Sequence, residues 1–262
     1  MKLSIITVNL NNKSGLQKTF DSVINQTNKN FEWIVVDGAS TDGSVEIIKD
    51  YATYISRWIS EPDKGIYHAM NKGILEASGD YLLFLNSGDI LHSINTINDI
   101  LHDKLEEDIV IYDIRLNHRD KIVKKDLSLL SSLSVVSFLL ISTFPHQSTL
   151  IKKTILKDCG MYNLNYKIVA DWALFYEACV IKNASYVYKE GIVISEYDMT
   201  GLSSTYKDIA NNERKVFLNK YYSERMIQYL VSSCNRELQQ INLNRPIYKM
   251  LYKSLLWFSN KL

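Results

Sequence analysis

Apolar runs alternate with segments of helical periodicity over the first ninety residues. Short, continuous apolar runs predict buried strands, and apolar residues recurring every three to four positions predict helices. The predicted strands are 3–8, 33–36, 57–60 and 81–85, and the predicted helices are 14–25, 45–51 and 66–76. Such strands, separated by helices, are typical of a parallel sheet covered on both faces. The pattern therefore predicts an α/β fold with an open, mainly parallel sheet.

The pattern is weaker after Asp89. Strands are predicted at 109–112, 148–151 and 191–197, and a helix at 169–181. Residues 205–235 contain neither Gly nor Pro and predict one or two further helices. Because no linker or repeat divides the chain, we expect one domain over residues 1–204 and a helical C-terminal extension over residues 205–262.

The composition is that of a globular protein. The 262 residues are 46% hydrophobic and 23% charged, with 30 basic against 29 acidic side chains, which argues against a disordered or nucleic-acid-binding chain. The three Cys residues are far apart and contain no C-x-x-C, so we expect neither a zinc site nor a disulfide framework, and a cytoplasmic location. Residues 1–6 predict a buried strand rather than a signal peptide, and the longest apolar stretch, 135–144, is too short to span a bilayer.

Polar and acidic residues follow each of the four predicted strands of the first half. In open α/β sheets, ligands bind outside the carboxyl ends of the strands. The first strand is not followed by G-x-G-x-x-G, which disfavours a dinucleotide-dependent oxidoreductase. Ser44 stands where a P-loop needs its Lys, which disfavours ATPase chemistry. The four strand ends are Thr7-Val8-Asn9, Asp37 to Gly43, Glu61 to Gly65, and Asn86 to Asp89.

Two carboxylates at these strand ends, Asp37 and Asp89, each have two interpretations. Asp37 directly follows an apolar strand, where it could accept hydrogen bonds from a base and a ribose hydroxyl. Alternatively, Asp37-Gly38 is a turn, and Ser40, Thr41 or Asp42 caps the next helix. Asp89 could hold a divalent cation while the backbone of Gly88 approaches a diphosphate, or it could cap a helix.

Taken together, these motifs strongly resemble the family-2 glycosyltransferases of the GT-A fold, which is Rossmann-like. The likeness is closest to the subgroup that builds bacterial O-antigen and exopolysaccharide, and it covers about residues 1–205. Besides the strand ends, the motifs that carry it are residues 60–73, Pro145-His146-Gln147-Ser148, Val169-Ala170-Asp171-Trp172 and Gly201-Leu202-Ser203-Ser204.

The resemblance implies transfer of a sugar from a nucleotide diphosphate sugar, with UDP-sugars favoured, to a hydroxyl of a glycan or lipid-linked acceptor, with inversion. It assigns the base and ribose to Thr7, Asn9 and Asp37. It makes Asp89 the metal-binding carboxylate for Mg²⁺ or Mn²⁺. Asn86 and Gly88 stand where other members carry Asp, so the metal site is reduced. The remaining donor-binding residues that it implies are Lys64, Asn71, Lys72, Asn86, Ser87 and Gly88.

The chemistry needs a base for the acceptor hydroxyl, and the resemblance assigns this role to Asp171. Burial beside Trp172 should raise the pKa of Asp171 toward a useful range. The alternative is that Asp171 caps the helix it begins. His146 either contacts the diphosphate or the acceptor, or is a structural, hydrogen-bonded histidine.

The C-terminal extension is basic, with ten Lys and Arg against four Asp and Glu in residues 205–262. Arg245, Lys249 and Lys253 form one stripe of a predicted helix beside Trp257 and Phe258. This pattern suits a helix on the anionic inner face of the cell membrane, and the alternative is packing on the chain's own domain or in a homodimer. Two other functions remain open: a non-catalytic nucleotide-sugar-binding scaffold, and a nucleotidyltransferase.

Overall fold

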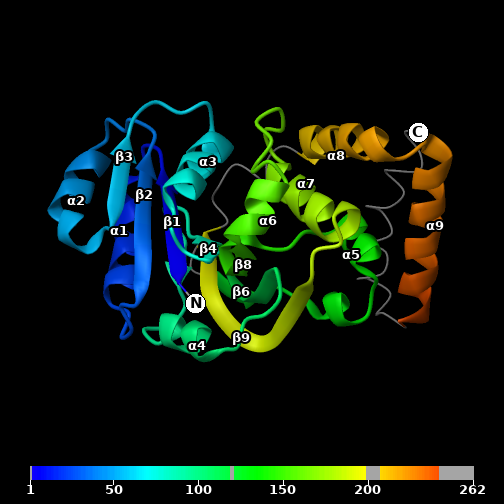
Figure 1. Ribbon diagram of the computed structural model, residues 1–262, viewed down its shortest axis with the longest axis horizontal. Coiled ribbons are helices and arrows are strands. Elements are labelled where there is room, and N and C mark those ends of the chain that lie inside the picture. Colours follow the sequence, from blue (N-terminus) through cyan, green and yellow to red (C-terminus); the bar gives the residue numbers. More distant parts are fainter. Residues whose placement is uncertain (1, 119–120, 199–206, 242–262) are drawn as a thin grey trace.

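The computed structural model describes residues 2–118, 121–198 and 207–241. Its strands form a single curled sheet in the order β3-β2-β1-β4-β8-β6-β9-β5, with β7 paired to β6 (Figure 1). The strands are β1 (Leu3–Asn9), β2 (Phe31–Asp37), β3 (Arg57–Ser60), β4 (Tyr81–Phe84), β5 (Ile90–Leu91), β6 (Ile109–His118), β7 (Lys121–Lys124), β8 (Thr149–Lys152) and β9 (Tyr186–Asp198).

Strands β3, β2, β1 and β4 run parallel, and β6 runs parallel to β9. The junction between these two parts is antiparallel, through β4–β8 and β8–β6. The first part matches the alternation of strands and helices in the sequence, and it confirms the predicted α/β sheet. The antiparallel junction was not predicted, because single short strands carry no sign of their direction.

Helices cover both faces of the sheet (Figure 1). They are α1 (Lys13–Ile24), α2 (Ser44–Asp50), α3 (Ile66–Glu76), α4 (Thr96–His102), α5 (Val135–Ile141), α6 (Lys153–Asp158), α7 (Ala170–Tyr176), α8 (Lys207–Tyr221) and α9 (Glu224–Gln240). Shorter turns of 3₁₀ helix lie at Ala52–Tyr54, Ser128–Ser131 and His146–Ser148, and a π-helical turn at Glu177–Ile181 extends α7.

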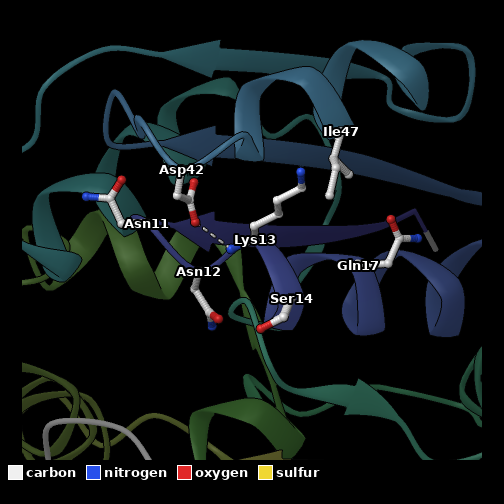
Figure 2. A pocket seen from close by; sticks show the side chains of 7 residues that line it. All are labelled: Asn11, Asn12, Lys13, Ser14, Gln17, Asp42 and Ile47. Atoms are coloured by element: carbon white, nitrogen blue, oxygen red, sulfur yellow. Dashed lines mark hydrogen bonds between the residues drawn. The ribbon is translucent and has the colours of Figure 1, made fainter.

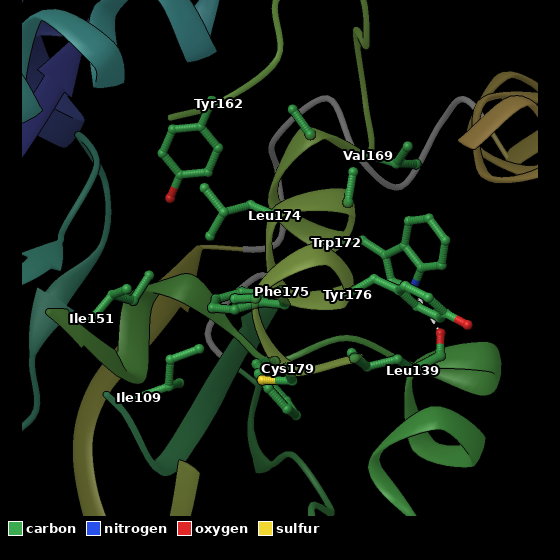
Figure 3. Close-up of a cluster of buried hydrophobic side chains, with 14 of the residues drawn as sticks. Ile109, Leu139, Ile151, Tyr162, Val169, Trp172, Leu174, Phe175, Tyr176 and Cys179 are labelled. Carbon is green, nitrogen blue, oxygen red and sulfur yellow. Dashed lines mark hydrogen bonds between the residues drawn. The ribbon is translucent and has the colours of Figure 1, made fainter. Parts of the chain in front are cut away.

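Alternate residues of β1, β2, β4 and β6 enter two separate hydrophobic clusters, as the two-residue period of a strand requires. In β1, Leu3 and Ile5 pack with α1, whereas Ile6 and Val8 pack with α3. The cluster on the α3 face continues through α5, α7 and α8 to α9, so the described part of the C-terminal extension is packed on the sheet domain. Figure 3 shows this cluster around α7, with Trp172 at its edge donating its indole N–H to the Leu139 carbonyl at 2.6 Å.

Candidate active site

The ends of β1, β2 and β3 lie side by side and place Asp37 in the centre of a hydrogen-bond network. Asn9 pairs with Asp37 across β1 and β2, and Asp37 pairs with Ser60 across β2 and β3. Oδ1 of Asp37 accepts from Asn9 Nδ2 at 2.8 Å and from Ser40 Oγ at 2.6 Å. Oδ2 accepts from Ser60 Oγ at 2.8 Å and from the Ser40 backbone N–H at 2.9 Å. The network joins the two predicted residues Asn9 and Asp37 to two serines that were not predicted to bind ligand.

These donors decide the charge of Asp37, which is fully buried. Burial opposes its ionisation, but the hydrogen bonds from Ser40, Asn9 and Ser60 outweigh burial and lower its pKa below the ordinary value. Within the described part of the chain, Oδ1 of Asn9 is buried and has no hydrogen-bond donor. Asn9 therefore offers one acceptor to a ligand, because a buried carbonyl oxygen without a donor is costly.

The N-cap residue of α2 is Gly43, so none of Ser40, Thr41 and Asp42 holds the cap position, although Asp42 binds the first N–H of the helix. Oδ1 of Asp42 accepts the N–H of Ser44, the first residue of α2, at 3.1 Å. Ser40 instead bonds to Asp37, and the backbone N–H of Thr41 donates to Asn11 Oδ1 at 2.9 Å. The loop thus combines a side-chain bond from Asp42 to the start of α2 with the network around Asp37.

Thr7 lies on the same face of β1 as Asn9, two residues before it. Its hydroxyl is fully buried and accepts the indole N–H of Trp33 at 3.1 Å. The structure therefore does not bring the Thr7 side chain to the Asp37 network, although its backbone belongs to the same strand end.

Lys72 of α3 pairs with two acids of the loop between β3 and α3. Lys72 Nζ lies 2.6 Å from Asp63 and 2.9 Å from Glu61, and these carboxylates raise its pKa against the effect of burial. Asp63 in turn lies against Gly38, where a Cβ would stand 3.1 Å from its Oδ2. Lys64 is exposed. Asp63 was not predicted as a site residue, since an acidic residue in a loop usually lies in a solvated turn.

Asn71 joins α3 to the segment after α6. Its Nδ2 donates to the Tyr162 carbonyl at 2.8 Å, and its Oδ1 accepts the Tyr162 N–H at 2.9 Å. Both ends of the amide are thereby used, which favours a structural role.

The end of β4 is a tight turn over residues 86–89. Gly88 has φ +106°, a conformation that favours glycine, and its N–H donates to Thr19 Oγ1 at 3.0 Å. The Ser87 carbonyl accepts from Asn12 Nδ2 at 3.0 Å. A Cβ on Gly88 would stand 3.4 Å from Oδ2 of Asp198, so the end of β9 lies against this turn.

Asp89 is 3% exposed, and its Oδ1 accepts the Asp198 N–H at 3.1 Å. Burial raises its pKa to about 7, with the charge of Asp198 acting in the same direction and His146 acting against it. The capping interpretation of Asp89 is wrong, because Asp89 precedes the short strand β5 and not a helix. Asp198 was not singled out from the sequence, since it meets Asp89 only through the pairing of β5 with β9.

The oxygen atoms at this turn suit a hard cation that takes only a few of its ligands from the protein. In the described residues no group of three His, Cys, Asp or Glu side chains could hold a metal. Mg²⁺ commonly takes only one or two carboxylates and completes its shell with substrate phosphates and water. Asp89 supplies such a carboxylate, and Asn86 Oδ1 is buried without a donor among the described residues. This donor set fits Mg²⁺ or Mn²⁺ bound together with a diphosphate.

His146 connects the end of β4 to α7. Its Nε2 lies 3.2 Å from Asn86 Nδ2, and its Nδ1 lies 3.5 Å from Oδ2 of Asp171. A proton on Nδ1 faces the carboxylate of Asp171, and Nε2 meets the amide of Asn86. Three of the predicted residues, far apart in sequence, are thus in one chain of contacts.

Asp171 lies in the first turn of α7 and is ionised more easily than a free aspartate. Burial raises its pKa, as expected, but the hydrogen bond and charge of His146, the Trp172 N–H and the Tyr67 hydroxyl outweigh burial. The net shift is downward, so the expectation of a raised pKa is wrong. The physical reason is the number of donors that reach Asp171, among them Tyr67 Oη at 3.2 Å and Trp172 N at 2.8 Å.

The cap of α7 comes from α8 rather than from Asp171. Glu213 accepts the backbone N–H groups of Lys167 at 2.7 Å, Ile168 at 3.0 Å and Val169 at 3.2 Å. A carboxylate at a helix N-terminus satisfies free N–H groups and interacts favourably with the helix dipole. Asp171 itself contacts only the N–H of the next residue in this turn. Its carboxylate therefore remains directed to His146 and Tyr67.

A pocket of about 470 Å³ lies beside the Asp37 network, between α1 and α2 (Figure 2). The N–H of Lys13 donates to Asp42 Oδ2 at 2.8 Å at its edge. The N–H of Asn11, which also lines this pocket, donates to Ser40 Oγ at 2.8 Å and connects it to the Asp37 network. Its other lining residues are Asn12, Ser14, Gln17 and Ile47.

The mainly parallel, curled sheet with helices on both faces has the architecture of the GT-A fold. The model of glycosyl transferase family 2 matches residues 4–169, and the chain belongs to that family. It is thus a glycosyltransferase enzyme rather than a nucleotidyltransferase.

Relatives and solved structures agree with this assignment. The chain is 28% identical to a PGL/p-HBAD biosynthesis glycosyltransferase of Mycobacterium tuberculosis over 78% of this chain and 80% of that protein. It is 31% identical to an uncharacterized glycosyltransferase of the same species over 77% of each. The fold is similar to Staphylococcus aureus TarS 1-349 in complex with UDP-GlcNAc, with TM-score 0.66, 16% identity, and 98% of this chain and 72% of that chain covered. It is also similar to the mannosyltransferase PcManGT from Pyrobaculum calidifontis in complex with GDP-Man and Mn²⁺, with TM-score 0.59, 16% identity, and 98% and 70% covered.

Over the ranges that the structure describes, no helix is long and apolar enough to cross a membrane. The motif at residues 201–204 and the basic stripe at Arg245, Lys249 and Lys253 lie outside these ranges.

Proposed function

We propose that this protein is an inverting glycosyltransferase that moves a sugar from a nucleotide diphosphate sugar to an acceptor hydroxyl. The observation that carries the proposal is the contact chain from Asn86 at the end of β4 through His146 to Asp171 on α7. Through these contacts the candidate base, Asp171, is separated by one side chain, His146, from the strand end where we propose that the diphosphate and the cation bind. The family membership supports the same reaction class.

In the proposed reaction, the acceptor oxygen bonds to the anomeric carbon while the bond from that carbon to the diphosphate oxygen breaks. The acceptor proton passes to Asp171, and the nucleoside diphosphate leaves on the opposite face. Asp171 is suited to receive a proton because it is ionised, and His146 and Tyr67 fix its direction. Its low pKa makes Asp171 a weak base in the ground state. General base catalysis nevertheless typically raises the reaction rate by about 10²–10⁴-fold.

The strand ends of β1 to β3 are the proposed site for the base and ribose of the donor. Asp37 is held as an anion, and Asn9 Oδ1 remains to accept from a ligand. Leu10 is 59% exposed and lies 3.1 Å from the place of a Cβ on Gly38, so it offers an apolar surface next to these polar groups. We favour UDP as the nucleotide, which the TarS complex with UDP-GlcNAc supports.

Asp89, with Asn86 beside it, would hold Mg²⁺ or Mn²⁺, and the cation would neutralise the charge that develops on the leaving diphosphate. Lys72 lies at the Asp63 side of the strand ends and is paired with acids there, so we propose that it orders the loop. Gly88 lets the backbone approach the diphosphate.

The acceptor is proposed to be a glycan or a lipid-linked sugar of bacterial surface polysaccharide, such as O-antigen. We propose a cytoplasmic protein with a peripheral place on the inner membrane face, which the basic stripe in residues 245–262 supports. Removal of residues 245–262 is expected to weaken binding to anionic liposomes. Unchanged liposome binding would contradict this placement, and a change of oligomeric state instead would favour packing in a homodimer.

A screen of UDP- and GDP-sugars with Mn²⁺ tests the function, with the released nucleotide as readout. We expect turnover of a UDP-sugar by the wild-type protein and its loss in Asp171→Asn. Asp158→Asn is the matched control, because Asp158 is an exposed aspartate at the end of α6. Turnover that survives Asp171→Asn would contradict the assignment of the base.

A further inference from the structure

Two basic side chains that the proposed mechanism does not use lie near Asp171. Lys125 follows β7, and its Nζ donates to the Thr143 carbonyl at 3.3 Å, three residues before His146. Arg214 is on α8, next to Glu213, and its guanidinium lies over the Trp172 ring at 5.0 Å from the centroid. The charge of Asp171 acts on both of them. Two cations from different segments therefore meet at the helix that carries the candidate base.

Both cations are partly buried, and in the described part of the chain neither forms a direct ion pair, although the charge of Asp171 acts on both. In the described ranges, each of the ion pairs within 4.0 Å involves other basic residues, and Arg214 Nε is buried without a hydrogen-bond acceptor. The rest of the sequence supplies little to neutralise them, since Asp120 is the one acidic residue in 1, 119–120, 199–206 and 242–262.

Unpaired buried charge is costly, and its cost appears in the pKa of each group. Burial lowers the pKa of Lys125 to about 8, with Arg214 acting in the same direction and Asp171 against it. Burial lowers the pKa of Arg214 to about 10, again against Asp171. Both groups remain charged at neutral pH. Such an arrangement is stabilised when an anion from outside the chain binds between the cations.

We propose that Lys125 and Arg214 form an oxyanion site next to Asp171 that binds a phosphoryl group of one of the two substrates. Arg presents several N–H donors in a planar fork that matches phosphate, and Lys adds a compact charge. This inference rests on the proposed function, in which phosphoryl groups are the anions that reach this site. The group belongs either to the diphosphate of the donor or to a phosphate carried by the acceptor.

Binding of inorganic pyrophosphate to the full-length protein in metal-free buffer tests the site without the Asp89 cation. Calorimetric titration should show binding that weakens about tenfold or more in Lys125→Gln and in Arg214→Gln, as expected for a lost charge-assisted hydrogen bond. Arg214→Lys should retain most of the affinity. Lys215→Gln, which removes the neighbouring charge on α8, should bind pyrophosphate like the wild type. Thermal unfolding of each variant separates lost binding from lost folding, and Arg214→Lys provides a second, less disruptive test of the same position.

Repeating the titration with saturating UDP identifies the source of the phosphoryl group. If UDP displaces pyrophosphate, the site holds the donor diphosphate, and if pyrophosphate still binds, the site serves a phosphate on the acceptor. The proposal is overturned if pyrophosphate does not bind the wild type, or if both Gln variants bind it as the wild type does. Turnover of nucleotide sugars is measured separately. Pyrophosphate binding that depends on Lys125 and Arg214, without any turnover, would reject the proposed function and keep the site. Turnover together with pyrophosphate binding that depends on neither side chain would reject the site alone.

Discussion

Asp37 and Asp89 are buried carboxylates at the ends of β2 and β4 in the same sheet, yet their surroundings are opposite. Asp37 accepts four hydrogen bonds, from Asn9, Ser60 and two groups of Ser40. Asp89 accepts the Asp198 N–H and lies within range of the negative charge of Asp198. The pKa of Asp37 is lowered, whereas burial raises that of Asp89 to about 7.

The difference shows that burial alone does not decide the charge of a strand-end carboxylate. Donors within the fold fix Asp37 as an anion before any ligand arrives. Asp89 has few donors, so its ionisation near neutral pH depends on what binds next to it. The first environment suits recognition of a neutral base and ribose, and the second suits a cation.

Asp171 provides the strongest test of this comparison, because it resembles Asp37 in its donors but is proposed to react. Asp171→Asn is expected to lower turnover of the donor sugar by about 10²–10⁴-fold, since the amide cannot take the acceptor proton. The affinity for UDP should stay within about twofold of the wild type. Steady-state kinetics and calorimetry measure the two effects.

The opposite result for Asp171→Asn would place this carboxylate with Asp37. Weaker UDP binding with little loss of kcat would mean that Asp171 holds substrate and does not act as the base. Asp158→Asn controls for the loss of one negative charge and should change neither quantity.

Asp37→Asn is expected to destabilise the fold by about 2 kcal/mol at pH 7, because an amide NH₂ then faces groups that donate. The lowered pKa determines the pH dependence. The stabilisation from Asp37 is present above the ordinary Asp range, and it is lost as pH falls through the folded-state pKa. Urea unfolding of both proteins should therefore show a gap in unfolding free energy at pH 7 that shrinks in acid.

A constant gap between the two proteins at every pH would show that Asp37 stabilises the fold by shape and not by charge. Asp158→Asn serves again as the control and should follow the wild-type curve.

Asp89 should contribute to stability with a pH dependence opposite to that of Asp37, because its pKa is raised and not lowered. Its carboxyl group is protonated below about pH 7 in the folded protein, and a cation needs the ionised form. Mn²⁺ affinity is therefore expected to be about tenfold weaker at pH 6 than at pH 8, as loss of one proton requires. Without metal, stability that is present below the unfolded pKa of Asp is lost as pH rises through 7.

Titration of Mn²⁺ against pH measures this effect, and Asp89→Asn should abolish it. A Mn²⁺ affinity that is equal at pH 6 and pH 8 would show that Asp89 is already ionised and belongs with Asp37.

The sequence was sufficient for the parallel part of the fold and for the site elements that lie at its strand ends. Asn9, Asp37 and Asp89 follow apolar strands directly, and parallel strands bring their carboxyl ends to one edge. The same argument could not foresee that Thr7, which shares a face with Asn9, accepts the Trp33 indole N–H, because that contact depends on how β1 and β2 pair. The pKa of Asp171 was mispredicted for a similar reason, since its donors come from α3 and from the segment before β8.

Residues that act across long separations were beyond sequence reasoning. Asp198 reaches Asp89 through β9, and Glu213 reaches the start of α7 from α8. Neither has a local pattern that differs from a solvated acid. The Asp37 network, by contrast, is built from residues next to strand ends, and for this reason a motif could reveal it.

Asp37 is held by neighbouring residues, whereas Asp171 lies on a helix whose start is held by Glu213 of α8. Substitution of Glu213 has the smallest expected effect. Glu213→Gln keeps the shape of the cap on α7 but weakens the bonds to the N–H groups of 167–169, at a cost of about 1 kcal/mol. Turnover should fall a few-fold with KM for the donor unchanged, because the substitution shifts Asp171 and leaves the Asp37 network intact. Glu224→Gln, at the exposed start of α9, is the control. Equal turnover in both variants would mean that Asp171 is held by His146 and Tyr67 alone.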